Sequence, residues 1–290
     1  MNSHHPSFSA LLNRRPPTIY SQLYTSPLTT LAKALSSALS PAIPAPPTGI
    51  RVICISDTHN TQPDLPDGDI LLHAGDLTQS GSLSELRSQI EWLDAQPHRY
   101  KVVIAGNHDL CLQASTEEID WRSLIYLRDS ATTLHFPGGR SLKIYGSPWT
   151  PKHGNWAFQY PRTGADPWEG AVPEDVDILL THGPPRCHLD LDDLGCGYLL
   201  EEVRRREPIL HVFGHIHAGY GKRMVLWDGF ERAYEEAVGK GGSWWALGRM
   251  VFCVFSRLKG DSGRGTVMVN AAVVGGFRDE QRREAITVTI

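Results

Sequence analysis

This sequence of 290 residues lacks any run of the roughly 18 apolar residues that a membrane-spanning helix needs. It also lacks a continuous apolar stretch near its start, so we do not expect a secretory signal. Positive charge is not in excess: the formal net charge of −4 argues against a generally basic surface that holds a nucleic-acid polymer. The hydrophobic content of 41% is that of a soluble globular protein.

Cysteine pairs are also missing. The five cysteines include no Cys-x-x-Cys motif, and an odd, scattered set does not suggest a disulfide framework. They predict reduced thiols in a cytoplasmic protein. No acidic residue precedes Asp57, and such a Ser-rich leader is also typical of a mitochondrial transit peptide, which is the alternative. We expect residues 1–48 to form an N-terminal arm with a Pro-rich linker, followed by one domain over residues 49–290.

Short apolar, β-branched runs recur from Arg51 onward, and each ends in Gly, Asp, His or Asn. Continuous runs of this length predict strands that are buried on both faces. Between them, residues 82–96 and 194–208 carry apolar residues at helical spacing. Strands that alternate with helices predict an α/β domain, in which ligands gather at the carboxyl ends of the strands. The seven predicted strands contain RVICI, DILLH, YKVVI, SLKIYG, DILLT, ILHVF and TVMVN.

Residues 220–265 depart from this alternation. They predict a helical insertion, in which two helices are joined at residues 239–242. The second helix, residues 243–258, is short and apolar with a basic end. We expect it to be buried against the domain; the alternative is contact with a membrane surface or a lipid-like substrate.

Five polar clusters follow the predicted strands, and apart from His108 and Asp109 they offer two carboxylates, one amide oxygen and four imidazoles. Borderline divalent metals favour this mixture of ligands, whereas calcium favours oxygen. Two divalent ions and two aspartates would leave the site electropositive, so it would attract an anionic phosphate ester. The clusters are Asp57-Thr58-His59, Gly75-Asp76, Gly106-Asn107-His108-Asp109, Thr181-His182-Gly183 and Gly214-His215-Ile216-His217.

In this order, the blocks SDTH, GDLTQSG, GNHD, THGPP and GHIH resemble those of the calcineurin-like metallophosphoesterase superfamily. The segments IYGSPWTPKHGNWAFQYPR and LHVFGHIHAGYG resemble its branch of brain-type metallophosphoesterase domain-containing proteins. The resemblance covers residues 52–272. It implies a four-layer α/β-β/α sandwich of two mixed β-sheets flanked by helices.

The same resemblance implies two divalent metal ions as cofactors. We expect Mn²⁺, with Fe, Zn, Co or Ni as alternatives that the same ligands accept. Six of the seven ligands would be divided between the two ions, and the seventh would bridge them. The first ion would be held by Asp57, His59 and His217, the second by Asn107, His182 and His215, and both by Asp76.

Two further residues have implied roles in catalysis. His108 would face the scissile phosphate and stabilise or protonate the leaving oxygen, and Asp109 would orient His108 by hydrogen bonding. The histidines of the last block, His215 and His217, lie two residues apart. In an extended chain they would share a face, and Ile216 between them would point into the core.

The resemblance implies a hydrolase that acts on a small-molecule phosphoester through a hydroxide activated by the two metals. Protein phosphatases of this superfamily have arginines in the Gly-Asp and Gly-Asn-His blocks, and this sequence has none there. We therefore expect a phosphodiesterase for a nucleotide or cyclic nucleotide, although Arg186 beside THGPP could reach a substrate. The alternatives are a phosphomonoesterase or protein phosphatase, and a non-catalytic scaffold on the same fold.

Some residues near these blocks have simpler interpretations. His73 and His211 lie inside predicted strands, so we expect them to be packed or hydrogen-bonded and not to bind metal. His188 is expected at the surface. Trp149, Trp156 and Phe158 lie in a long loop that either forms a wall of the active site or packs into the core.

Overall fold

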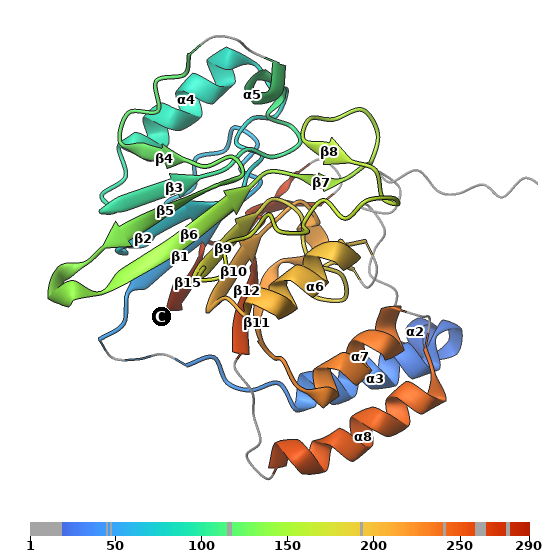
Figure 1. The fold of residues 1–290 in the computed structure, drawn as a ribbon. Coiled ribbons are helices and arrows are strands. Elements are labelled where there is room, and N and C mark those ends of the chain that lie inside the picture. The colour runs from blue at the N-terminus through green and yellow to red at the C-terminus, as the bar shows by residue number, and fades with distance from the viewer. Residues whose placement is uncertain are drawn as a thin grey trace, which may run out of the picture.

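The computed structural model describes residues 19–44, 46, 48–114, 118–191, 194–239, 242–258, 265–276 and 279–290. Two mixed β-sheets form its centre (Figure 1). In the first sheet, the order is β15 (Ile286–Thr289), β1 (Arg51–Ile55), β2 (Ile70–His73), β3 (Tyr100–Val103) and β4 (Leu124–Tyr126). In the second, it is β11 (Gly221–Leu226), β12 (Gly265–Asn270), β10 (Leu210–Phe213), β9 (Ile178–Thr181), β6 (Ser141–Ser147) and β5 (Ser130–His135).

The inner strands of both sheets are parallel. β1 to β4 run parallel to one another, as do β6, β9, β10 and β12. The edge strands β15, β5 and β11 pair antiparallel with their neighbours. All seven predicted strands are present, and each is largely buried because both faces of the parallel strands are covered.

The two sheets pack face to face, and the largest apolar core lies between them. Val52 and Val102 of the first sheet contribute to it together with Ile144 and Val212 of the second. The outer face of the first sheet packs against α4 (Leu83–Asp94), and that of the second packs against α6 (Gly197–Arg206). The predicted four-layer α/β-β/α sandwich is therefore confirmed.

Helix α4 shows how the local sequence sets an element. The hydroxyl of Ser82 accepts a hydrogen bond from the amide of Glu85, whose carboxylate accepts one from the amide of Ser82. This capping box satisfies donors that the first turn of a helix leaves unpaired. The buried residues Leu86, Ile90 and Leu93 then recur at the spacing that turns one helix face toward the sheet.

A separate group of helices lies at one end of the molecule (Figure 1). It contains α2 (Ile19–Thr25), α3 (Pro27–Ala38), α7 (Gly229–Gly239) and α8 (Trp244–Leu258). The predicted helical insertion over residues 220–265 thus begins with a strand, β11, because residues 221–226 pair with β12. Its two helices are confirmed, and they pack with α3 from the predicted N-terminal arm.

Shorter elements connect these layers. They are α5 (Leu110–Ala114), β7 (Thr150–Pro151), β8 (Gln159–Tyr160), β13 (Val274–Gly275), β14 (Gln281–Arg282) and the 3-10 turns η1 (Pro137–Gly139) and η2 (His217–Gly219). All five cysteines are unpaired. Within the described ranges, no helix combines the length and the apolar character needed to cross a membrane.

Candidate metal centre

The predicted ligands are carried by loops that leave neighbouring strands at the same edge of each sheet. Ile55 at the end of β1 lies opposite His73 of β2, which lies opposite Val103 of β3. Because these parallel strands end level with one another, the loops that follow them converge. The two sheets are linked here, since the amide of Ser56, just after β1, donates to the carbonyl of Ala271, just after β12.

Several of these loop residues adopt strained backbone conformations. Asp57, His59, Asp76 and His215 have φ angles of 52°, 43°, 55° and 64°. Non-glycine residues in this left-handed region cost about 1–3 kcal/mol each, and they persist where the surroundings over-determine them. Four of the seven predicted ligands share this strain, which is typical of a functional site.

The donor atoms of these residues form a compact cluster. Nε2 of His217 lies 3.2 Å from Oδ1 of Asp57. Oδ2 of Asp76 lies 3.7 Å from Nε2 of His59 and 3.4 Å from Nε2 of His182. Asp76 is therefore placed between two histidines that the resemblance assigns to different metal ions, as a bridging carboxylate should be.

The remaining two ligands extend the same cluster. Nε2 of His182 lies 2.9 Å from Oδ1 of Asn107, while its Nδ1 donates to the carbonyl of Ala74, 2.8 Å away. The hydrogen bond from Nδ1 to Ala74 fixes the His182 ring so that Nε2 faces the cluster. The ring of His215 lies 5.0 Å from that of His182. The structure thus brings all seven predicted ligands to one place.

Two observations show that this cluster fits metal ions. Both ring nitrogens of His59 are buried and have no hydrogen-bond partner among the described residues, although buried polar atoms are normally paired. The loops also exclude other side chains: a Cβ at Gly214 would overlap the carboxylate of Asp57, and one at Gly106 would overlap Asp76. The mixture of imidazole, carboxylate and amide donors suits borderline divalent cations.

The charges of the cluster also favour cations. Burial alone would raise the pKa of Asp57 and of Asp76, but the neighbouring imidazoles, mainly His217 and His182, outweigh it and hold both values below the usual range. Burial would lower the pKa of those two histidines, but the carboxylates raise it to about 10 for His217 and about 9 for His182. A cation held by these two histidines would therefore displace their protons.

His108 lies at the edge of this cluster. Its ring is 4.7 Å from that of His59 in an edge-to-face arrangement, and it stacks on Trp156 at 4.2 Å between centroids. Its Nδ1 lies 2.9 Å from the carbonyl oxygen of Gln79 and donates to it. Phe158 is fully buried. The long loop therefore does both expected things: Trp156 walls the site, and Phe158 packs into the core.

The structure corrects the role expected for Asp109. Its carboxylate does not hydrogen-bond the His108 ring but accepts from the amides of Gly106, Leu77 and Thr78 and from the Thr78 hydroxyl, at 2.7–3.3 Å. The side chain is fully buried, and burial together with the charge of Asp76 raises its pKa to about 6. Asp109 therefore ties two motif loops together and positions His108 only through the backbone.

The structure also differs from the backbone geometry that we expected for the segment from Gly214 to His217. The strand ends at Phe213, His215 is left-handed, and η2 begins at His217, so the two histidines do not share the face of an extended strand. Ile216 is nevertheless 1% exposed, as predicted. The side-chain amide of Asn270 donates to the carbonyl of Ile216 and so helps to hold this turn.

Sequence reasoning missed one acidic contact at the site. Oδ1 of Asp279 lies 3.5 Å from Nδ1 of His217, and such a carboxylate commonly orients a metal-ligating histidine. Arg283 donates to the backbone carbonyl of His217. Both residues follow the last motif by more than sixty positions, and no spacing pattern in the sequence marks them.

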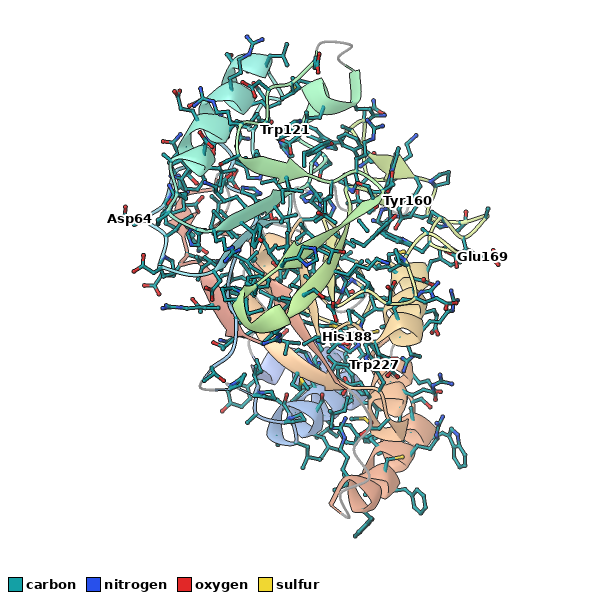
Figure 2. All side chains as sticks on the ribbon, turned by 60° about the vertical axis from the view of Figure 1, so that its left-hand side comes forward. Asp64, Trp121, Tyr160, Glu169, His188 and Trp227 are labelled. Atoms are coloured by element: carbon teal, nitrogen blue, oxygen red, sulfur yellow. The ribbon has the colours of Figure 1, made fainter. Side chains whose placement is uncertain are left out.

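Three histidines outside the cluster can also be compared with their predicted positions. Nε2 of His73 lies 3.0 Å from the Thr58 hydroxyl, and Nε2 of His211 lies 2.9 Å from that of Thr181, so both are buried and hydrogen-bonded as predicted. The surface position expected for His188 is wrong. Its ring is fully buried beside that of Trp227 (Figure 2), and Nε2 lies 2.9 Å from the carboxylate of Glu235 on α7.

Comparison with known proteins agrees with this geometry. The profile of the family described as calcineurin-like phosphoesterase matches residues 50–219. A protein of Emericella nidulans named probable rhamnogalacturonate lyase C is 50% identical over 297 residues, which cover 97% of this chain but 28% of that protein. Metallophosphoesterase domain-containing protein 1 of Homo sapiens and that of Mus musculus are each 42% identical over 221 residues, 64% of this chain and 65% of theirs. The chain thus spans less than two thirds of the length of these relatives.

Proposed function

This chain belongs to the calcineurin-like phosphoesterase family, and on that premise we propose that it is a metal-dependent hydrolase of phosphate esters. The observation that carries the proposal is the position of Asp76. Its carboxylate lies within 3.7 Å of imidazole nitrogens of both His59 and His182. Asp57 adds a second carboxylate beside His217, and together these residues give the donors that two adjacent cations require.

When bound, two divalent cations would supply Lewis acidity toward a phosphoryl oxygen and lower the pKa of water into the physiological range. The chain supports that chemistry by holding the donors rigidly. His182 is fixed through the carbonyl of Ala74, and His217 through Asp279. Preorganised ligands of this kind avoid a cost of reorganisation during the reaction.

His108 is the residue we propose as proton donor. Because its Nδ1–H donates to the carbonyl of Gln79, Nε2 is the nitrogen that exchanges protons. The ring lies beside His59, at the border between the ligand cluster and Trp156, which is 41% exposed. From this position Nε2 can protonate the leaving oxygen as the ester bond breaks.

We propose a small phosphodiester, of the nucleotide or cyclic nucleotide type, as the substrate. The Gly-Asp and Gly-Asn-His blocks contain no arginine to grip a monoester dianion, and a diester carries one negative charge fewer. We further propose Mn²⁺ as the native metal, which the nitrogen and oxygen donors suit. A cytoplasmic location is our proposal too, supported by five unpaired cysteines.

A direct assay tests this function. We expect the purified protein to hydrolyse bis(p-nitrophenyl) phosphate with added Mn²⁺, faster than it hydrolyses p-nitrophenyl phosphate, and to lose activity on chelation. His108→Ala should abolish turnover and keep the bound metal. A preference for the monoester would favour the phosphomonoesterase alternative. Bound metal without turnover on either ester would favour a scaffold, and failure to bind metal would overturn the proposal.

A further inference from the structure

A cavity beside the metal centre is not used by the proposed reaction. Its volume is about 450 Å³, which lies within the range of sites for small molecules. Ser147, the last residue of β6, lines the cavity, and its carbonyl accepts a hydrogen bond from the amide of His182. The cavity therefore adjoins the backbone of the metal centre, but none of the seven predicted ligands lines it, nor does His108.

The walls of this cavity are mainly aromatic. Four rings line it, and all four belong to one apolar cluster against the second sheet. Three of the rings are buried, and the fourth, Trp149, is half-buried. Trp149 is also the third aromatic residue of the long loop, and this cavity is the place that it lines. The rings are those of Tyr145, Trp149, Tyr160 and Trp168.

Hydrogen bonds within the protein hold the polar ends of these rings. Nε1 of Trp149 donates to Oδ2 of Asp129, 2.8 Å away, and Nε1 of Trp168 donates to the hydroxyl of Tyr160, 3.1 Å away. The hydroxyl of Ser147 donates to Oδ1 of Asp129 at 2.8 Å. A ligand therefore meets chiefly ring surface, and the rings are oriented before it binds, which lowers the entropic cost of binding.

Asp129 gives the cavity a negative charge. Its side chain is exposed, and both carboxylate oxygens accept hydrogen bonds from the neutral donors of Ser147 and Trp149. Within the described part of the chain no cation pairs with it, and the guanidinium of the neighbouring Arg128 lies over the ring of Phe158 instead. The described residues that line the cavity include no Lys, Arg or His. A carboxylate whose charge is not compensated attracts a cation.

These features favour one chemical class of ligand. Asp129 would repel an anion, and its charge would add nothing to the binding of an apolar molecule. A sugar needs hydrogen-bonding partners, and most polar groups of this cavity already bond to one another. A quaternary ammonium ion needs no hydrogen bonds, and aromatic rings attract it through their quadrupoles.

We propose that this cavity binds a small quaternary ammonium ion of the choline type. The alkylated nitrogen packs among the rings of Tyr145, Trp149 and Trp168, and the carboxylate of Asp129 balances its charge from the exposed side. The proposal does not rest on the phosphoesterase activity, because the cavity shares no side chain with the metal centre.

Calorimetric titration of the full-length protein with choline tests this site. The control ligand is 3,3-dimethylbutan-1-ol, which has the shape of choline but a neutral carbon in place of the charged nitrogen. We expect choline to bind at least about tenfold more tightly than the alcohol, because only the cation gains from the rings and from Asp129. Equal affinities, or no binding of choline at millimolar concentrations, would overturn the proposal.

A chelator distinguishes this cavity from the metal centre. We expect the affinity for choline to be the same with and without EDTA, since no predicted metal ligand lines the cavity. Loss of choline binding on chelation would place the choline at the metal centre and contradict the proposal.

Two substitutions of exposed carboxylates form a matched pair. Asp129→Asn removes the charge and keeps the shape, and Asn tolerates the left-handed backbone at this position, where φ is 49°. It should weaken choline binding by about fivefold, as expected for a partly exposed pair of charges, and leave the affinity for the alcohol unchanged. Asp64→Asn is the control, because Asp64 is also exposed and lies across the molecule from Tyr160 (Figure 2). Equal choline affinities of the two variants would refute the role of Asp129.

Trp149→Leu tests the aromatic wall. It should weaken choline binding by roughly tenfold and binding of the alcohol much less, because leucine remains apolar but has no ring quadrupole. Circular dichroism and bound metal should match the wild type, so that a loss of affinity reports on the cavity. If this variant does not fold, Asp129→Asn still decides the question. A folded Trp149→Leu protein with the choline affinity of the wild type would overturn the proposal.

Discussion

Trp156 lies flat on the imidazole of His108, with 4.2 Å between ring centroids and 23° between ring planes. His108 is thereby held on three sides, by Trp156, by the edge of His59 and by the carbonyl of Gln79. Such support matters because a proton donor must stay within hydrogen-bonding reach of the oxygen it protonates. Trp156 is therefore a positioning residue for His108, and its partly exposed ring also forms the rim of the site.

Replacing Trp156 tests that role. We expect Trp156→Ala to lower kcat by roughly tenfold, because an unsupported His108 ring samples unproductive orientations. Trp156→Phe should restore most of the rate, since a flat ring can still stack. Bound metal, measured by elemental analysis, should not change in either variant. Equal rates for the alanine and phenylalanine variants would contradict the positioning role.

The shared position of Asp76 predicts unequal effects on metal content. Asp76→Asn should reduce the metal bound per chain at both sites, because its carboxylate lies between His59 and His182. His59→Ala should mainly reduce one of the two equivalents. Mass spectrometry of metal content at limiting Mn²⁺ distinguishes the variants. If His59→Ala lost both metals and Asp76→Asn lost one, the assignment of the bridging ligand would be wrong.

Two glycines form a matched pair. A Cβ at Gly214 would collide with the Asp57 carboxylate and with Ser56, so Gly214→Ala should destabilise the fold by about 1–3 kcal/mol and weaken metal binding. Gly248 on α8 faces open space, and Gly248→Ala should stabilise by roughly 0.5–1 kcal/mol through helix propensity. Chemical denaturation measures both. If Gly214→Ala changed neither the free energy of unfolding nor metal binding, the loop that carries Gly214 would have to be able to move away from Asp57.

The buried ring of His211 predicts a pH dependence of stability. Burial, and to a smaller extent the charge of His188, lowers the pKa of His211 to about 3, so the unfolded chain takes up a proton first as the pH falls. The stabilisation is complete above the unfolded pKa of about 6.5 and decreases below it, by roughly 2 kcal/mol between pH 6.5 and 5. His211→Gln should show a shallower loss over that interval in urea titrations. Parallel curves for the two proteins would show that His211 does not titrate on unfolding.

The fold class and most of the metal centre followed from local sequence. Each strand of the parallel core is a short apolar run, and each ligand block comes directly after one, so the chain order of the blocks already implied their convergence at the strand ends. The helix over residues 83–94 was equally readable, because Ser82 and Glu85 complete its cap within four residues. The strands, the ligand blocks and this helix are all marked by residues close together in sequence, so they can be predicted without knowledge of tertiary contacts.

Only the tertiary structure decided the contacts between residues that lie far apart in the chain. Asp279 contacts the ring of His217, Trp156 stacks on His108, and Glu235 pairs with His188. In each case a turn or an insertion brings the two residues together, and no short sequence pattern predicts the course of that segment. Asp109 illustrates the limit within a motif: it is adjacent to His108, yet four donors from three other residues hold its carboxylate. A buried polar group must be hydrogen-bonded, and its partners are the groups that the packed fold places beside it. The sequence therefore determined which functional groups this protein has, and the tertiary structure decided which residues hold each of them.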